Sequence, residues 1–325
     1  MDRRRTVLCF LIALLLAMAA LALSLAVGRY PIVWGEVWEV GMSNRVFFTL
    51  RLPRTLMALT AGFGLGVAGS TYQTVFQNPL AAPDVIGVAS GASAGAAAAI
   101  LFLGGSITAV TLASFAGGMA AVLAALGLAS AARGRGIGAI VLSGIAVNAV
   151  AQAVLMLMKL SADPERQLAS IEFWTMGSFA DITGDKFLGT LPWTVAGLTG
   201  LFLLHRQVLL LGLERDEAHM LGVPVAGMRQ VVLLLATLVT GSIVSVTGLI
   251  SFIGLLAPHI ARLITRSSRF STVVLSGLTG GILLLFSDVL ARSIGASEVP
   301  VSIVTSLLGA PFLFWLLCRR EGGNG

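Results

Sequence analysis

Apolar segments of about twenty residues follow one another through almost the whole chain. Of its 325 residues, 57% are hydrophobic and only 11% are charged, whereas soluble domains carry about 25% charged residues. About twenty apolar residues in an α-helix cross the hydrocarbon core of a bilayer. Lipid offers the backbone no hydrogen-bond partners, so segments of this length must be helical. The sequence therefore predicts an all-α, polytopic membrane protein in which residues 1–325 form a single transmembrane domain.

About ten membrane spans are expected, and an even number places both termini on the same side. Their approximate ranges are 7–27, 53–76, 85–103, 107–130, 137–158, 187–205, 228–247, 249–265, 272–293 and 300–318. The first run exceeds the apolar core of a signal peptide, which is about 7–15 residues, so it is expected to be a span. Most of the 21 lysines and arginines fall on the side of the termini. This excess predicts that both termini are cytoplasmic.

One stretch, from Leu211 to Pro224, breaks the apolar pattern with the sequence L-G-L-E-R-D-E-A-H-M-L-G-V-P. Acidic residues stand early, where the helix dipole favours them, apolar residues could form a stripe, and a glycine supplies a stop. These residues are Glu214, Asp216 and Glu217, then Leu213, Ala218 and Leu221, then Gly222. The pattern predicts a cytoplasmic surface helix that a partner outside the membrane could contact. The alternative is an ordinary solvated loop helix.

Charged residues also occur at the outer ends of two spans. Arg51 and Arg54 flank Pro53, and proline is favoured in the first helical turn. Arginine at a helix N-terminus opposes the dipole, so these residues either extend toward lipid headgroups or dock an acidic partner. Asp288 precedes Arg292 by four residues, which is the favourable order for a pair on one helix. An acid inside a span is a candidate functional residue, although a structural pair explains it equally well.

Polar residues in two further places are candidates for a translocation path. The corner N-P-L-A-A-P-D, residues 78–84, interrupts two apolar helices, and irregular backbone at membrane depth must be covered by protein or line a cavity. The predicted span over residues 137–158 contains polar residues but no charged residue. The candidate path residues are Asn78, Pro79, Ser143, Asn148 and Gln152. The alternative reading is a tight turn together with ordinary interhelical hydrogen bonds.

Several functions are not supported by the sequence. The Walker A pattern G-x-x-x-x-G-K-[ST] does not occur, so the chain is not expected to hydrolyse ATP by that route. Three scattered histidines supply no metal or catalytic cluster, and neither a metal, a cofactor nor an enzymatic activity is expected. The net charge of +6 comes from residues in short loops, so no nucleic-acid partner is predicted.

Five motifs, in order along the chain, together resemble the FecCD permease family. They are R-L-P-R at 51–54, Q-N-P-L-A-A-P-D at 77–84, L-G-L-E-R-D-E-A-H-M-L-G-V at 211–223, G-L-I-S-F-I-G-L-L-A-P-H-I-A-R at 248–262 and E-V-P-V-S-I-V-T-S-L-L-G-A-P-F at 298–312. The resemblance runs essentially from end to end. Members of this family are the membrane subunits of type II ABC importers for iron-siderophores, haem and cobalamin.

The resemblance implies an assembly. It predicts ten helices per subunit, a homodimer or pseudo-dimer with one path at the interface, two cytoplasmic ATPase subunits that bind ATP and Mg²⁺, and one extracytoplasmic solute-binding protein. The ATPase-coupling residues it implies are Leu211, Gly212, Glu214, Asp216, Glu217, Ala218, Leu221, Gly222 and Val223. The residues it implies for docking the binding protein are Arg51, Arg54 and Arg292.

The expected function is that of a permease subunit in a bacterial inner membrane, importing a bulky metal chelate. Iron-siderophore is the first expectation because it is the commonest assignment in the family, and haem or cobalamin is possible. No residue distinguishes these cargoes. The alternative is an ion-coupled secondary transporter that uses Asp288, since such a transporter needs a titratable residue near the midplane.

Overall fold

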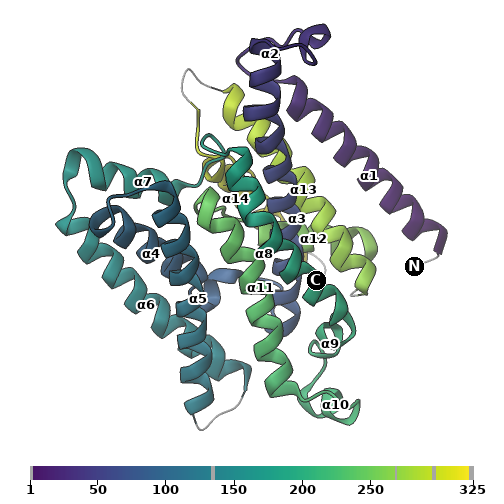
Figure 1. Ribbon diagram of the computed structural model, residues 1–325. Helices are drawn as coiled ribbons and strands as arrows, with labels where there is room; N and C mark the ends of the chain where they lie inside the picture. Colours follow the sequence, from purple (N-terminus) through teal and green to yellow (C-terminus); the bar gives the residue numbers. More distant parts are fainter. Residues whose placement is uncertain (1–2, 133–135, 268, 295–297, 322–325) are drawn as a thin grey trace.

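The computed structural model describes residues 3–132, 136–267, 269–294 and 298–321, which fold into helices joined by short connections (Figure 1). The long helices are α1 (Arg3–Ala26), α3 (Leu52–Val75), α4 (Val88–Phe102), α5 (Ile107–Ala131), α6 (Ile137–Ser161), α8 (Gly184–Leu203), α11 (Val225–Thr247), α12 (Ile253–Thr265), α13 (Phe270–Ser293) and α14 (Val301–Glu321). Each predicted span falls on one of these helices, so the all-α prediction is confirmed.

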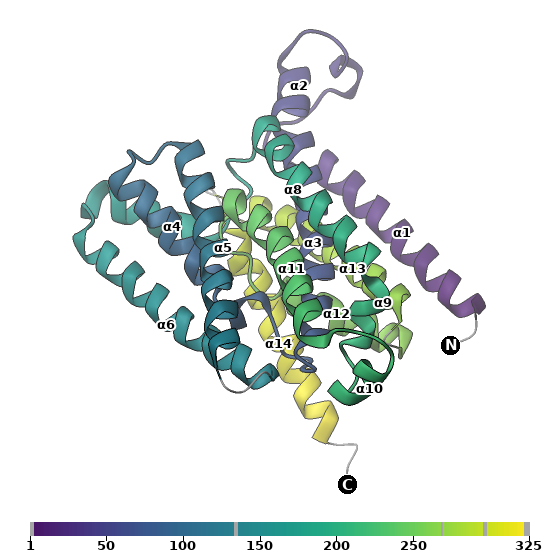
Figure 2. The same ribbon diagram turned by 60° about the horizontal axis from the view of Figure 1, so that its bottom comes forward.

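Short helical elements connect the long ones. They are η1 (Trp34–Glu36), α2 (Met42–Arg45), η2 (Val46–Arg51), η3 (Pro83–Ile86), η4 (Pro164–Leu168), α7 (Ala169–Met176), α9 (His205–Leu210) and α10 (Arg215–Met220). The α2 and α10 elements lie at opposite ends of the bundle (Figures 1 and 2). We call these the α2 end and the α10 end. Helix α1 begins, and α14 ends, toward the α10 end (Figure 2).

Five helices in the described part of the chain are long and apolar enough to cross a membrane. They cover Thr6–Ala26, Ile107–Ala131, Ile137–Ser161, Val225–Thr247 and Phe270–Ser293. By contrast, α12 has 13 residues and rises about 20 Å, less than the hydrocarbon core of about 30 Å. The predicted start of the span 249–265 was wrong. The backbone is left-handed at Phe252, with φ 67°, and the helix starts only at Ile253.

The non-helical segment before α12 is covered by protein, as membrane-embedded irregular backbone requires. A Cβ added to Gly248 would overlap the carbonyl oxygen of Trp174 in α7, so the two backbones touch. Ser178 donates its amide hydrogen to the carbonyl of Thr247 at 2.8 Å. The predicted span 85–103 also began too early, since η3 and the left-handed Gly87 precede α4.

Helix α3 lies against several other helices at the centre of the fold. Its glycines Gly62, Gly66 and Gly69 touch the backbones of α13 and α12, because an added Cβ would overlap Gly280, Ser276 and Gly254. Such small-residue contacts hold helices together in lipid, where the hydrophobic effect does not. Gly91 and Gly95 of α4 make the same kind of close approach, against Gly117 and Ala113 of α5.

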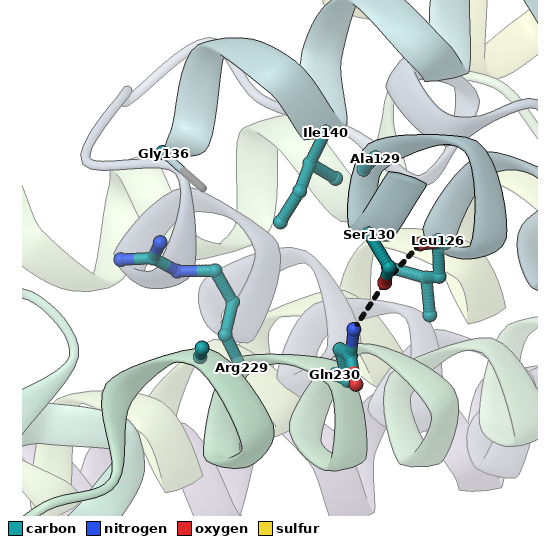
Figure 3. Close-up of a pocket in the computed structure, with 8 residues that line it drawn as sticks. Leu126, Ala129, Ser130, Gly136, Ile140, Arg229 and Gln230 are labelled. Carbon is teal, nitrogen blue, oxygen red and sulfur yellow. Dashed lines mark hydrogen bonds between the residues drawn. The ribbon is translucent and has the colours of Figure 1, made fainter. Parts of the chain in front are cut away.

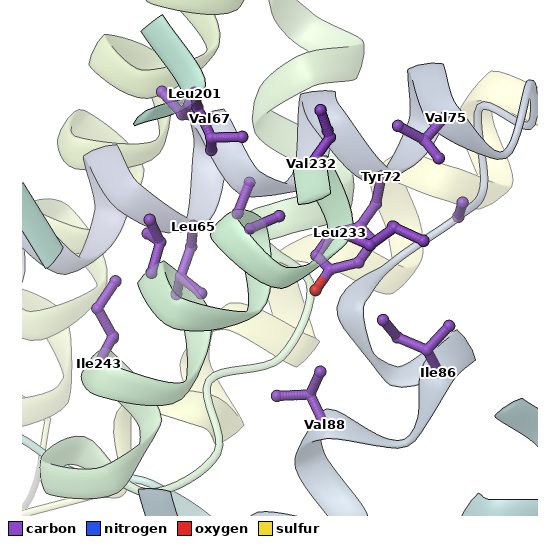
Figure 4. Packing of buried hydrophobic residues seen from close by; sticks show 14 of the residues in the cluster. Leu65, Val67, Tyr72, Val75, Ile86, Val88, Leu201, Val232, Leu233 and Ile243 are labelled. Atoms are coloured by element: carbon purple, nitrogen blue, oxygen red, sulfur yellow. The ribbon is translucent and has the colours of Figure 1, made fainter. Parts of the chain in front are cut away.

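A fully buried tyrosine joins α3 to α11 in the apolar core. Tyr72 is packed among Leu233 of α11 and the residues Ile86 and Val88 that connect to α4 (Figure 4). Its hydroxyl group forms a 2.9 Å hydrogen bond with the Thr237 hydroxyl, which satisfies a polar atom that would be costly to bury alone. Tyr72 therefore connects α3 both to α11 and to the η3 corner.

Candidate functional site

The charged segment predicted from the sequence forms the α9–α10 corner. The predicted helix over Leu211–Pro224 is shorter than expected, because only Arg215–Met220 is α-helical. It stops at Gly222, whose φ is +82°, with hydrogen bonds from the amides of Gly222 and Val223 to the carbonyls of His219 and Ala218. This is the left-handed glycine termination that the sequence predicted.

The corner has a buried side and an exposed side. Leu211, Ala218 and Val223 are 1%, 1% and 5% exposed and anchor the corner in the bundle. The predicted stripe does not form one buried face, since Leu213 and Leu221 are exposed. The acidic residues are exposed as well, and they are Glu214, Asp216 and Glu217. The segment therefore presents carboxylates together with apolar side chains outside the bundle.

Gly212 lies where the corner meets α3. A Cβ at this position would be 3.1 Å from Cγ2 of Thr74 in the last turn of α3. The corner consequently sits directly on the C-terminal end of α3, with little room for a larger side chain.

A buried charge cluster holds the other end of α3. The guanidinium of Arg54 donates to Asp288 of α13, with 2.9 Å from Nε and 2.8 Å from Nη2 to Oδ1. Its Nη1 donates to Oε2 of Glu298 at 2.8 Å. Asp288 is completely buried, and Arg292 is a second cationic partner at 3.4 Å. The predicted Asp288–Arg292 pair is thus present, but Arg54 makes the shorter contacts.

The remaining two arginines of this cluster bind the C-terminal end of α1. Arg51 Nη1 donates to the carbonyls of Leu25 and Ala26 at 2.9 Å each, and its Nη2 donates to Tyr30. Arg292 donates to the carbonyl and the hydroxyl of Ser24, at 2.8 and 2.7 Å. Cations are favoured at a helix C-terminus because its last carbonyls lack intrahelical partners.

The three arginines that the sequence suggested for docking are therefore all engaged within the chain. Arg51 and Arg292 are 5% and 6% exposed, and the side chain of Arg54 is 11% exposed. Their docking role stays a prediction. Sequence reasoning missed the pairing of Arg54 with Asp288, 234 residues away, although a lone acid in an apolar span signals that some cation must lie nearby.

The candidate path residues lie on the α3–α4 corner and on α6. Asn78 is exposed and accepts a hydrogen bond from the Leu80 amide at 2.9 Å, and Pro79 is half-buried. Asn148 and Gln152 are four residues apart, so they share a face of α6, and Gln152 is exposed. Ser143 is half-buried and lies nearly opposite Gln152 around the helix. Their role in a path stays a prediction.

The α3–α4 corner contacts the middle of α6. A Cβ added to Gly144 would overlap the carbonyl oxygen of Val85. A Cβ on Gly87 would lie 3.5 Å from the amide nitrogen of Asn148. The contact brings the irregular backbone of the corner next to Asn148 of α6.

A small pocket also opens between the α5–α6 hairpin and the start of α11. It has a volume of about 230 Å³ and is lined by Arg229, Gln230 and Ser130 among apolar residues (Figure 3). Gln230 Nε2 donates to the Ser130 hydroxyl at 2.8 Å, which ties the hairpin to α11. Arg229 is 4% exposed, so the pocket places positive charge close to the apolar core.

Comparison with known proteins adds the following findings. The FecCD transport family matches residues 14–319. The chain is 35% identical over 273 residues to the cobalamin import system permease protein BtuC of Halobacterium salinarum, covering 84% of this chain and 73% of that protein. It is 33% identical over 329 residues to the molybdate import system permease protein MolB of Haemophilus influenzae, covering 97% and 96%. A solved inward-facing ABC transporter of the metal-chelate type matches with TM-score 0.86 and 31% identity, covering 97% and 99%.

Proposed function

Because the chain belongs to the FecCD transport family and is a permease subunit of an ABC importer, we propose that it imports a bulky metal chelate. The two relatives carry different cargoes by name, cobalamin and molybdate, so cargo identity does not follow from similarity alone. Iron-siderophore is the leading proposal, as the commonest cargo in the family, and haem and cobalamin are the alternatives.

The proposed mechanism rests on the buried and exposed sides of the α9–α10 corner. Its buried residues Leu211, Ala218 and Val223 fix it to the bundle, while its carboxylates and the exposed Met220 and Leu221 face outward. Such a surface fits a cleft that offers both basic and apolar groups. We assign that cleft to a cytoplasmic ATPase subunit, two of which would bind ATP and Mg²⁺ and move the corner. The chain itself would hold no cofactor.

This assignment fixes the orientation of the chain. The α10 end is cytoplasmic, together with both termini, and the α2 end faces outward from a bacterial inner membrane. The excess of lysine and arginine on the side of the termini supports this orientation.

The α2 end is the proposed docking face for a solute-binding protein. Arg54 and Arg292 pair with the carboxylates of Asp288 and Glu298 there. Arg51 is bonded to the carbonyls of Leu25, Ala26 and Tyr30, so it adds one positive charge beyond those pairs. Arg54 is close to the surface, and Arg51 and Arg292 add positive potential from beneath it. An acidic surface on the binding protein would be attracted, mostly through a faster and salt-dependent association.

Helix α6 supports the proposal of a homodimer with the path at its interface. Gln152 is an exposed amide in the middle of an apolar helix of 25 residues. An amide without a hydrogen-bond partner in hydrocarbon costs several kcal/mol. A second copy of the chain, or a water-filled path between the copies, would satisfy this side chain.

The decisive experiment uses the permease reconstituted in vesicles with its ATPase and binding protein. Glu217→Arg should abolish ATPase association and ATP-driven uptake, whereas Glu36→Arg, a reversal at a residue that is also exposed but lies at the α2 end, should preserve ATPase association. Full uptake and full ATPase binding by Glu217→Arg would refute the proposed contact. Uptake that an ionophore abolishes and that ignores ATP would instead select the ion-coupled alternative. A cargo screen with the binding protein identifies the chelate.

A further inference from the structure

Helix α3 ends in a termination that glycine normally occupies, but here the residue is a glutamine. Gln77 has a left-handed backbone with φ +50°. Its amide bonds the carbonyl of Thr74, and the amide of Asn78 bonds the carbonyl of Gln73, both at 3.1 Å. This pair of bonds defines a Schellman termination, for which glycine is preferred because it has no Cβ. Helix capping alone therefore does not explain a glutamine at this position.

The Gln77 side chain reaches the α9–α10 corner. Its Nε2 donates to the carbonyl of Leu213 at 2.5 Å and lies 3.4 Å from the carbonyl of Leu211. Both carbonyls follow the end of α9, where helix-terminal carbonyls lack intrahelical partners. A single amide thus joins the last turn of α3 to the segment that leads into α10.

The neighbouring contacts show what the Gln77 hydrogen bond adds to the attachment of the α9–α10 corner to α3. Leu211 is buried and Gly212 packs against Thr74, so apolar contacts already seat the corner on α3. Apolar contacts are not directional and permit sliding, whereas a hydrogen bond fixes direction and distance. On the other side of Gln77, the chain continues into the corner that contacts α6.

We propose that Gln77 is a positioning residue that transmits displacement of α10 to the end of α3 and to the adjoining α3–α4 corner. The inference rests on the proposed contact between α10 and the ATPase. In this arrangement the ATPase moves α10, the amide bond draws the end of α3 with it, and the corner shifts against α6. Without the bond, α10 moves while α3 lags, and ATP hydrolysis is uncoupled from transport.

The test compares variants at this single position in the reconstituted complex with ATPase and binding protein. Gln77→Gly removes the amide and also relieves the left-handed strain. We expect an unchanged or higher melting temperature, normal ATP hydrolysis and a several-fold decrease in cargo imported per ATP hydrolysed. Gln77→Glu keeps the size and the strain but replaces the donor by an acceptor, and should show the same uncoupling. Gln77→Arg keeps a donor and should retain most of the coupling.

The outcomes separate this inference from the proposed function. If Gln77→Gly imports as much cargo per ATP as the unaltered protein, Gln77 is only a helix terminus and the inference is overturned. If the glycine and glutamate variants are uncoupled while the arginine variant is not, donation by the side chain is supported. The proposed function fails separately, when Glu217→Arg still binds the ATPase and imports cargo.

Discussion

At the α2 end, helix α3 is held by buried charges, and at the α10 end it is held by neutral hydrogen bonds at an exposed corner. The first set joins Arg54 to Asp288 of α13. The second joins Gln77 to the carbonyls of the α9–α10 corner. The two sets differ in the free energy needed to break them. We expect this difference to decide which end of α3 can move during transport.

The two costs differ by several-fold. Removing one partner of a buried ion pair costs about 3–5 kcal/mol, because the other charge is left uncompensated. A neutral hydrogen bond contributes only about 0.5–1.5 kcal/mol net. The α2 end is therefore suited to be a fixed pivot, and the α10 end is suited to respond to an ATPase. Between the two ends, glycines of α3 pack directly against the backbones of α13 and α12, and we expect this contact to keep α3 rigid.

The largest expected effect comes from removing the buried carboxylate. Asp288→Asn leaves Arg54 and Arg292 without their shared negative charge and should destabilise the protein by about 3–5 kcal/mol, measured by thermal unfolding in detergent. Adding Arg54→Gln should restore part of this loss, because one unpaired charge is removed with it. If Asp288→Asn unfolds at the same temperature as the unaltered protein, the buried charges do not hold the α2 end of α3 more strongly than hydrogen bonds hold its α10 end.

A smaller loss is expected when α1 loses its terminal cation. Arg51→Met removes charge-assisted hydrogen bonds to the carbonyls of Leu25, Ala26 and Tyr30, and we expect this set together to contribute about 1.5–3 kcal/mol. Arg45→Met is the matched control, because Arg45 is exposed on α2 and should change stability by less than about 0.5 kcal/mol. Equal melting temperatures for the two variants would show that burial of Arg51 contributes nothing.

The rigidity between the two ends is tested at a glycine. Gly66→Ala places a Cβ against the backbone of Ser276, and overpacking of this kind costs about 1–3 kcal/mol. The matched control is Gly127→Ala in α5, where a Cβ meets nothing within 4 Å. We expect thermal unfolding to distinguish the two alanines. Identical curves would mean that α3 and α13 separate easily, and α3 could not act as a rigid element.

Much of the fold could be predicted because each long helix lies within an apolar run of the sequence. The starts of α4 and α12 could not, since the residues before them are as apolar as the helices they precede. Phe252 is the clearest case: nothing in its residue type predicts a left-handed backbone, which is imposed by packing. Gly222 was predictable because glycine is the usual residue at such a stop.

The charge cluster and the Gln77 contact were beyond sequence reasoning for a different reason. The local pair Asp288–Arg292 was foreseen because spacing on one helix fixes it. Arg54 meets Asp288 only because α3 and α13 pack along their length, which residue spacing does not reveal. Gln77 looked like part of an ordinary corner, since its backbone angle and its two carbonyl partners are properties of the folded chain.

The smallest effect is expected at the α10 end, where stability and coupling should separate. Gly222→Ala forces a Cβ into a left-handed backbone with φ +82° and should cost about 1–2 kcal/mol, mostly by fraying α10. Gly227→Ala in α11 is the control, because its Cβ meets nothing within 4 Å and alanine favours a helix. We expect Gly222→Ala to shift the melting temperature little but to weaken ATPase binding measurably. If binding is unaffected, the shape of α10 is not what the ATPase recognises, and the exposed carboxylates alone must account for the contact.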